Sequence, residues 1–282
     1  MKTLPAPLAA HIASGSTTLG YLLRVTRVAP DNIVFAFTSA QEDVTYNAIV
    51  YRASPGLDVS SIQISSGASV DNLELTTLDD ESTFTRTEVL GGLWRNAVFI
   101  ISRYNYMNIS DGVEDIMAGT FGEIKYLRGK LVIELRGLQQ YLQQPIGEVT
   151  SPTCRARLGD VRCSINLAVW TVSSTVTSVT NAQNFTASGL TQVADYFGEG
   201  LLTWESGPSI HMSQKVKTHA AGGIIQLSLP MFSAIAIGHT FSITAGCRKR
   251  PTQDCRNKFN NILNFQGEPH LPGQDALTKS PK

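Results

Sequence analysis

Residues 119–137 read GTFGEIKYLRGKLVIELRG and contain the clearest structural signal in the chain. Two segments rich in apolar and β-branched residues, Thr120 to Leu127 and Lys130 to Arg136, flank the turn-forming pair Arg128-Gly129. Such segments separated by two turn residues are typical of a β-hairpin. We therefore predict an antiparallel hairpin here and expect the neighbouring segments to extend it into a sheet.

The rest of the sequence also predicts mainly β structure, with little helix. β-Branched and aromatic residues gather in short segments bounded by Gly, Pro, Asn or Asp, as is typical of strands. In the first half, strands are expected at 21–28, 32–38, 44–53, 59–65 and 96–104, strand or short helix at 70–78, and helices at 83–93 and 137–144. In the second half, strands are expected at 168–179, 198–205, 209–218, 224–229 and 240–244, with one helix at 253–261 and an extended end.

Turn-forming residues near position 150 divide the chain. Pro145-Ile146-Gly147 and Ser151-Pro152 interrupt the pattern of strands. A chain of 282 residues is long enough for two domains with separate hydrophobic cores. We predict a mainly β protein with a minor α+β character: one β-rich domain over 1–150 and a second over 151–282.

The charge balance excludes a globally basic nucleic-acid binder. Lys plus Arg and Asp plus Glu number 23 each, so the formal net charge is zero. Charged residues make up 16% of the chain, below the roughly 25% typical of soluble domains. Two interpretations stay open: a Ser/Thr-rich β protein, or a surface that partner subunits largely cover.

The N-terminus and the apolar runs indicate neither secretion nor membrane insertion. The longest plain apolar run, 97–101, is far shorter than the roughly 18 residues of a spanning helix. Pro5, Pro7 and His11 interrupt the alanine-rich start that could otherwise serve as a signal peptide. We expect synthesis in the cytoplasm, where thiols stay reduced.

All four cysteines lie in the second half, at Cys154, Cys163, Cys247 and Cys255. Eight residues separate the first two and seven the last two. Two disulfides, four unrelated thiols or one metal site could explain them, and a reducing compartment disfavours disulfides. We favour a metal site. Because the spacings exceed those of zinc ribbons, an iron–sulfur cluster becomes an alternative to zinc.

Basic residues surround both cysteine pairs. Guanidinium and ammonium groups near a thiol favour its thiolate form, and we expect these to offset the charge of four thiolates. A solvated basic surface or a nucleic-acid contact is the alternative. The basic residues are Arg155, Arg157, Arg162, Arg248, Lys249, Arg250, Arg256 and Lys258, opposed by Asp160 and Asp254.

The sequence lacks the motifs of a hydrolytic enzyme. Its five histidines form no H-E-x-x-H pair, and no G-x-S-x-G occurs. His211 and His219 flank a predicted strand and could approach a cysteine, but we favour packed or exposed histidines as their explanation. We predict no catalytic residue and no enzyme, with a cell-wall hydrolase as the alternative.

The last forty residues contain a long motif of mixed composition. It comprises Gly246-Cys247-Arg248-Lys249-Arg250, Cys255-Arg256-Asn257-Lys258-Phe259-Asn260-Asn261, Asn264-Phe265-Gln266-Gly267 and Pro269-His270-Leu271-Pro272-Gly273. This motif resembles the baseplate hub proteins of tailed phages and gene transfer agents, and it is similar to the tail-tip protein L of phage lambda. The 119–137 hairpin and the N-terminal strand pattern resemble the same family.

The resemblance implies a structural protein of the virion tail tip, assembled in the host cytoplasm. It implies a homotrimer that joins the end of the tail tube to the central fibre. The implied partners are other tail proteins, namely the distal tail protein and the central fibre or host-specificity protein. A small-molecule substrate, a membrane span, and DNA contact beyond transit through the tail channel are not expected.

The resemblance also implies a cofactor. Hubs of this family hold a [4Fe–4S] cluster in the C-terminal domain, and Cys154, Cys163, Cys247 and Cys255 match its ligands in order. A zinc-binding interaction module is the alternative. We further expect Asn257, Asn260 and Asn264 to fold the C-terminal segment back through side-chain hydrogen bonds to the backbone.

Overall fold

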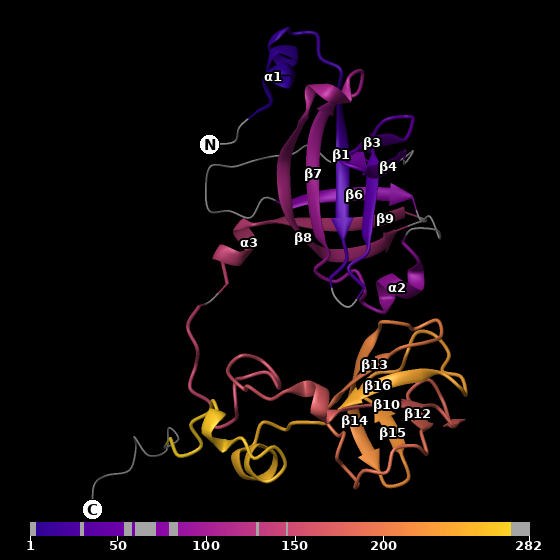
Figure 1. Ribbon diagram of the computed structural model, residues 1–282, viewed down its shortest axis with the longest axis vertical. Coiled ribbons are helices and arrows are strands. Elements are labelled where there is room, and N and C mark those ends of the chain that lie inside the picture. The colour runs from indigo at the N-terminus through magenta and orange to yellow at the C-terminus, as the bar shows by residue number, and fades with distance from the viewer. Residues whose placement is uncertain are drawn as a thin grey trace, which may run out of the picture. The chain divides into compact units, whose positions relative to one another are not determined.

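The computed structural model describes residues 4–28, 31–53, 58–59, 72–78, 84–127, 130–144 and 146–271. The chain divides into two compact units, Met1–Pro145 and Ile146–Lys282. We call them the N-terminal and the C-terminal unit (Figure 1). The division falls at the Pro145-Ile146-Gly147 segment that interrupts the strand pattern in the sequence.

One sheet forms the N-terminal unit, and its described strands follow the order β3-β4-β2-β1-β7-β8-β9-β6-β5. Neighbouring strands are antiparallel, except for the parallel pair β2 and β4. Figure 1 shows the sheet curving, so that β6 and β9 run across β1 and β7. The strands are β1 (Leu19–Thr26), β2 (Val34–Thr38), β3 (Val44–Tyr46), β4 (Ile49–Ala53), β5 (Asp58–Val59), β6 (Asn72–Leu78), β7 (Val98–Asn105), β8 (Val113–Leu127) and β9 (Lys130–Gly137).

The 119–137 hairpin is confirmed as the pair β8 and β9, which are antiparallel and end at Leu127 opposite Lys130. The turn pair 128–129 lies outside the described residues. β8 extends upstream to Val113 and pairs with β7 on its other side. Its register shifts against both neighbours, and such irregularities allow a strand to bend and twist more strongly. The bent strand β8 thus carries the curvature of the sheet.

The predicted strand over 44–53 is wrong, because a tight turn divides it into the hairpin β3 and β4. Asn47 and Ala48 at the turn have φ values of 51° and 61°, the left-handed conformation at both central positions that two-residue hairpins use. The asparagine was a turn signal inside an otherwise strand-like segment. The segment 70–78 forms strand β6, and most of 59–65 lies outside the described residues.

Helices are short in this unit: α1 (Ala6–Ala13), α2 (Arg86–Leu90), the 3₁₀ turn η1 (Ile109–Asp111) and α3 (Gln139–Leu142). The two predicted helices, 83–93 and 137–144, correspond to α2 and α3 but are shorter than expected. At the start of α2 the Thr85 side chain accepts a hydrogen bond from the Glu88 amide, an N-terminal cap. The helix ends at Gly91.

Aromatic rings fill the core that the curved sheet encloses. The Trp94 indole is fully buried, with its ring centroid 4.5 Å from that of Phe84 and 4.9 Å from that of Phe35. The buried Arg27 guanidinium lies 5.2 Å from the Trp94 ring centroid and pairs with Glu88 at 3.0 Å. The other buried members are Leu23, Val25, Phe37, Leu75, Ala97, Phe99, Ile101, Phe121, Leu131, Ile133 and Leu135.

A second antiparallel sheet forms the C-terminal unit, with described strands in the order β10-β16-β13-β14-β15-β12-β11. Phe185, Trp204 and Phe241 make its aromatic core, with ring centroids 5.5–5.7 Å apart. The strands are β10 (Thr171–Thr175), β11 (Ser178–Val179), β12 (Asn184–Thr186), β13 (Leu201–Trp204), β14 (Ser213–Ala220), β15 (Ile224–Leu227) and β16 (Thr240–Thr244).

Most predicted strands of this unit are confirmed, including the hairpin β13 and β14. Two segments differ. Residues 167–170 form a 3₁₀ turn, η2 (Leu167–Trp170), ahead of β10. In place of the helix over 253–261 there is a single wide turn, η3 (Pro251–Arg256), followed by η4 (Ile262–Asn264). Both departures lie near cysteines: η2 begins four residues after Cys163, and η3 contains Cys255.

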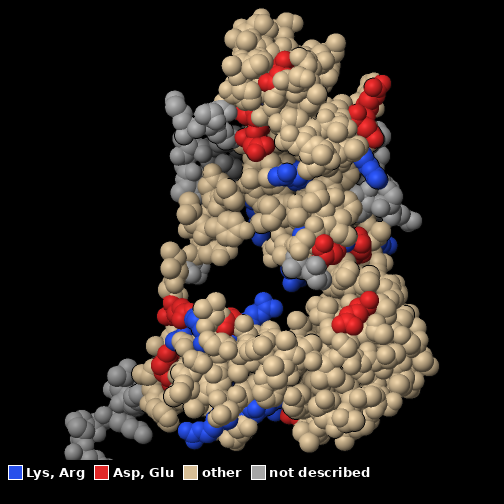
Figure 2. Space-filling view, in the orientation of Figure 1, with Lys and Arg blue, Asp and Glu red and all other residues tan. Residues whose placement is uncertain are grey.

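Large parts of the surface carry no charge. Figure 2 shows broad areas that are neither acidic nor basic on both units. Apolar side chains stand fully exposed in the cysteine-bearing segments, with Val161 95% and Leu263 96% exposed. Exposed apolar residues in such number favour an interpretation in which partner subunits cover the surface. Among the described residues, no helix is long and apolar enough to span a bilayer.

We expect Trp94→Ala to lower the free energy of unfolding of the N-terminal unit by about 3–5 kcal/mol, because it empties the aromatic core. Tyr141→Ala is the matched control, since this ring is 55% exposed and its loss should cost less than about 0.5 kcal/mol. Urea denaturation followed by circular dichroism measures both. Equal effects of the two substitutions would contradict this account of the core.

Candidate metal centre

All four cysteines line one cavity in the C-terminal unit. Cys154 and Cys163 reach it from the segment before the sheet, and Cys247 and Cys255 from the segment after β16. Each is partly buried and none forms a disulfide. Apolar side chains complete the wall, among them Ala156, Leu158, Ile165, Phe259 and Phe265. The fold thus brings the thiols of two distant segments together in one largely apolar cavity.

In the part of the chain that the structure describes, no group of three or more His, Cys, Asp or Glu side chains is placed to hold a single metal ion. The cavity therefore has the donor set of a metal site without the geometry of a mononuclear one.

Asp160 shapes the first cysteine loop. Its carboxylate accepts hydrogen bonds from the backbone amides of Arg157, at 2.9 Å, and Cys163, at 2.7 Å. The hydrogen bond from the Cys163 amide is the main reason that the pKa of Asp160 lies below its ordinary value. Gly159 and Ser164 adopt φ values of 82° and 57°, which let the chain reverse within this short loop.

Asp254 has the same role in the second loop. Its carboxylate accepts from the Arg248 amide at 2.8 Å, and its backbone carbonyl accepts from the Phe259 amide at 2.9 Å. The side chain is buried. Within the wide turn η3, the Cys255 amide donates to the Arg250 carbonyl at 3.2 Å. The carboxylates of Asp160 and Asp254 therefore satisfy two backbone amides in the first loop and one in the second.

Backbone hydrogen bonds join the two loops directly. The Cys154 amide donates to the Lys249 carbonyl at 3.0 Å, and the Arg155 amide donates to the Gln266 carbonyl at 2.9 Å. The Gln266 amide points back at the Cys154 sulfur, 3.4 Å away. The chain beyond Cys255 thus returns to lie against the first loop.

Asn261 connects both cysteine pairs. Its Nδ2 donates to the Cys163 carbonyl at 2.6 Å and lies 3.7 Å from the Cys163 sulfur. Its carbonyl accepts from the Cys255 thiol at 3.0 Å, and Asn264 Nδ2 donates to its Oδ1 at 2.7 Å. The expected bonds from Asn257, Asn260 and Asn264 to the backbone are therefore replaced by this one residue, supported by Asn264.

Glycines bring the strand end before Cys247 against a neighbouring turn. A Cβ added at Gly246 would lie 1.6 Å from the Gly198 carbonyl oxygen, and one at Gly200 would lie 2.1 Å from the Thr244 carbonyl oxygen. Neither position can accept a larger residue without a backbone shift. The packing role of Gly200 depends on its contact with β16, which is distant in the sequence.

Two of the thiols have raised pKa values, although Lys249 lines the cavity with them. Burial raises the pKa of Cys247, and burial together with the charges of the other three cysteines raises the pKa of Cys255 to about 11. Three nearby arginines have other partners. Arg155 forms two hydrogen bonds to Glu268, Arg162 pairs with Glu148, and Arg248 pairs with Asp195.

Lys258 is similarly occupied: its ammonium donates to the carbonyls of Gly246 and Tyr196 and lies 4.6 Å from the Tyr196 ring centroid. These basic residues therefore brace the loops, whereas Lys249 lines the cavity together with the sulfurs.

Histidine does not take part in the cavity wall. His219 is buried in β14, with its ring 5.0 Å from the Phe197 ring, and burial lowers its pKa. His211 lies in the turn before β14 with a φ of 66°. The packing interpretation of His219 is thus confirmed.

We expect Asn261→Ala to destabilise the C-terminal unit by about 2 kcal/mol, because it removes two side-chain hydrogen bonds at the meeting point of the loops. Asn257→Ala is the control. Its side chain is exposed, and the substitution should change the unfolding free energy by less than about 0.5 kcal/mol. Chemical denaturation of both variants tests this, and a destabilisation shared by Asn257→Ala would show that Asn261 has no special part.

Two family models match different parts of the chain. Residues 5–166 match the family described as "Baseplate hub protein, N-terminal attachment domain". Residues 195–275 match the family described as "Phage conserved hypothetical protein BR0599". The first match ends just beyond Cys163, and the second includes Cys247 and Cys255. No similar sequence was found among curated proteins.

A solved structure is similar over nearly the whole chain. One chain of "Virion of native gene transfer agent (GTA) particle" superposes with a TM-score of 0.89 at 28% sequence identity, covering 99% of this chain and 96% of that chain. The hub family match covers more than half of the residues. The chain therefore belongs to the baseplate hub family and is a structural component of the phage tail.

Proposed function

We propose that this hub protein holds a [4Fe–4S] cluster through Cys154, Cys163, Cys247 and Cys255, and that the cluster stabilises the C-terminal unit. One observation carries the proposal: four free thiols from two distant segments line a single cavity. Four thiolates are the ligand set of such clusters. Each thiolate binds a different iron, so the sulfurs need to surround a common space and need not meet at one point.

The charges around the cavity fit this assignment. The sulfurs repel one another as thiolates, and Arg155, Arg162 and Arg248 pair with carboxylates. A bound iron cluster would supply positive charge beside that of Lys249, and ligand thiols lose their protons on binding. Zinc, the alternative, requires the four sulfurs to converge on one ion, an arrangement that the described residues do not show.

We propose a structural and not a catalytic role for the cluster. With four protein ligands, every iron corner is occupied, which leaves no position for a substrate. The cluster would close the loop between Cys163 and Cys247, which contains all strands of the C-terminal sheet. A disulfide that closes a loop of roughly 100 residues stabilises the folded state by about 4–5 kcal/mol, and we expect a similar effect of the cluster. On this proposal the protein is not an enzyme.

Protein purified without oxygen should be brown and contain about four irons and four sulfides per chain. We expect Cys255→Ser to lose most of the iron, to be less soluble and to enter tails poorly. Arg256→Ala is the neighbouring control, because its exposed side chain does not line the cavity. Iron and sulfide analysis measures the outcome. A colourless protein with one zinc per chain would overturn the cluster and leave the tail role intact.

We further propose that the protein acts as a homotrimer that joins the end of the tail tube to the central fibre. The family's attachment domain spans the N-terminal unit, and the uncharged, partly apolar surface suits contacts with other subunits. A threefold ring would adapt a sixfold tube to a threefold fibre.

Electron microscopy of assembled tails should show three copies between the tube end and the fibre, each with the two units of this chain. Six copies, or a position elsewhere on the tail, would contradict the proposed joining role.

A further inference from the structure

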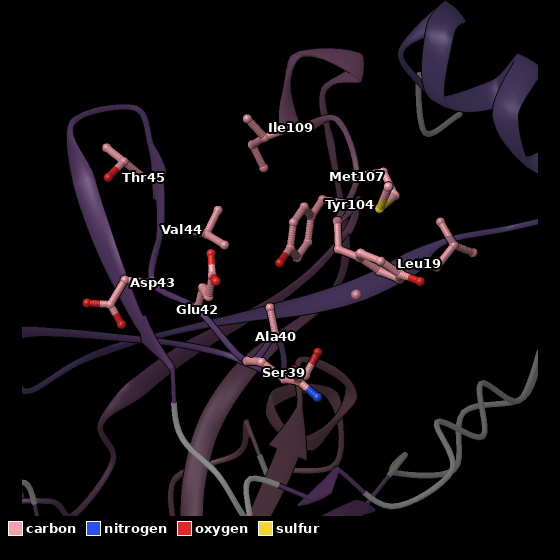
Figure 3. Close-up of a pocket in the computed structure, with 13 residues that line it drawn as sticks. Leu19, Ser39, Ala40, Glu42, Asp43, Val44, Thr45, Tyr104, Met107 and Ile109 are labelled. Atoms are coloured by element: carbon pink, nitrogen blue, oxygen red, sulfur yellow. The ribbon is translucent and has the colours of Figure 1, made fainter.

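A groove crosses one end of the N-terminal unit. It has a volume of about 780 Å³ and lies between the segment 39–45 and the residues at the end of β7 (Figure 3). This position is separate from the cysteine cavity, which belongs to the C-terminal unit. Its size is that of a site for a peptide or small ligand.

One side of the groove is acidic. Glu42 and Asp43 line it, and no Lys, Arg or His is among its lining residues. Asp43 is held in place, because its carboxylate accepts a hydrogen bond from the Ala53 amide at 2.7 Å. Neither carboxylate has an ion-pair partner among the described residues. In a chain of zero net charge, this side of the groove is locally acidic and would attract basic side chains of a partner.

The opposite side of the groove is apolar, and burial fixes its Tyr104 ring. Figure 3 shows Tyr104 and Met107 across from Glu42 and Asp43. Tyr106 and Met107 are 53% and 73% exposed, while the Tyr104 ring is buried and its hydroxyl lies 3.1 Å from that of Thr38. An exposed methionine beside aromatic rings is typical of surfaces that bind protein segments.

An unpaired strand edge completes the groove. Among the described strands, β3 ends the sheet order, and its residues Val44 and Thr45 line the groove. An exposed edge can accept an extended segment from another chain through backbone hydrogen bonds. The edge favours an extended peptide over a helix as the occupant.

We infer that this groove binds an extended segment of a neighbouring tail protein, in which Lys or Arg residues alternate with aliphatic ones. The basic residues face Glu42 and Asp43, the aliphatic ones pack on Tyr106 and Met107, and the backbone pairs with β3. The inference deepens the proposed joining role and rests on it, while it is independent of the cysteine cluster.

The test is a selection of random twelve-residue peptides on the immobilised full-length chain, with parallel selections on Glu42→Lys and Glu123→Lys. Glu123 is the matched control, an exposed carboxylate on β8 of the same unit that does not line the groove. Synthetic copies of the selected peptides are then measured by fluorescence anisotropy, also on Met107→Ser.

We expect the peptides to be enriched in Lys or Arg alternating with aliphatic residues. Their affinity should fall about tenfold or more on Glu42→Lys, fall severalfold on Met107→Ser, and remain unchanged on Glu123→Lys. Peptides with no basic enrichment, or with equal affinity for Glu42→Lys, would overturn the inference, as would the absence of any selected peptide.

If the chain self-associates and Glu42→Lys abolishes this self-association, the partner in the groove is a second copy of the chain. That result would overturn the assigned occupant. The joining role fails on a different result, namely a tail image in which the chain does not lie between tube and fibre. If the image places the chain between tube and fibre but the groove binds no peptide, the inference about the groove is wrong and the joining role stands.

Discussion

The C-terminal unit depends on one constraint: the segment that enters its sheet and the segment that leaves it must meet. Cys154 and Cys163 precede the strands, Cys247 and Cys255 follow them, and all four line one cavity. The backbone bond from Cys154 to Lys249 holds the two segments at the same place. A small sheet that closes its ends in this way loses less conformational freedom on folding, because the unfolded chain is already constrained once the link forms.

Most hydrogen bonds of the polar residues around the cavity go to the backbone and hold the loops in place. The Asp160 carboxylate accepts hydrogen bonds from two backbone amides of the first loop, and the Asp254 carboxylate accepts one from the second loop. Asn261 forms hydrogen bonds with both cysteine pairs. Arg155, Arg162 and Arg248 form ion pairs, and Lys258 binds carbonyls. Burial and the charges of the other cysteines raise the pKa of Cys255. Such a cavity favours positive charge from a bound inorganic group, and the proposed cluster supplies it.

The sequence predicted those parts of the structure that local patterns determine. Alternating apolar residues with a turn pair predicted the β8–β9 hairpin, and the cysteine spacing with the 246–273 motif pointed to four cysteines that line one cavity. Where the outcome depends on contacts between distant segments, the prediction was wrong or silent. The Asn47-Ala48 turn was hidden by β-branched neighbours, and the role of Asn261, rather than Asn257 or Asn260, depends on where Cys163 lies in space. The pairing of Arg155 with Glu268 likewise could not be foreseen from residue types near the cysteines.

The central claim is that four sulfurs from two distant segments enclose one inorganic core. X-ray absorption at the iron edge of the full-length protein, purified without oxygen, tests it most directly. The account predicts that every iron is surrounded by sulfur, with further irons in the next shell. Iron bound by nitrogen or oxygen alone, or a protein that takes up no iron while its four cysteines remain intact, would contradict it.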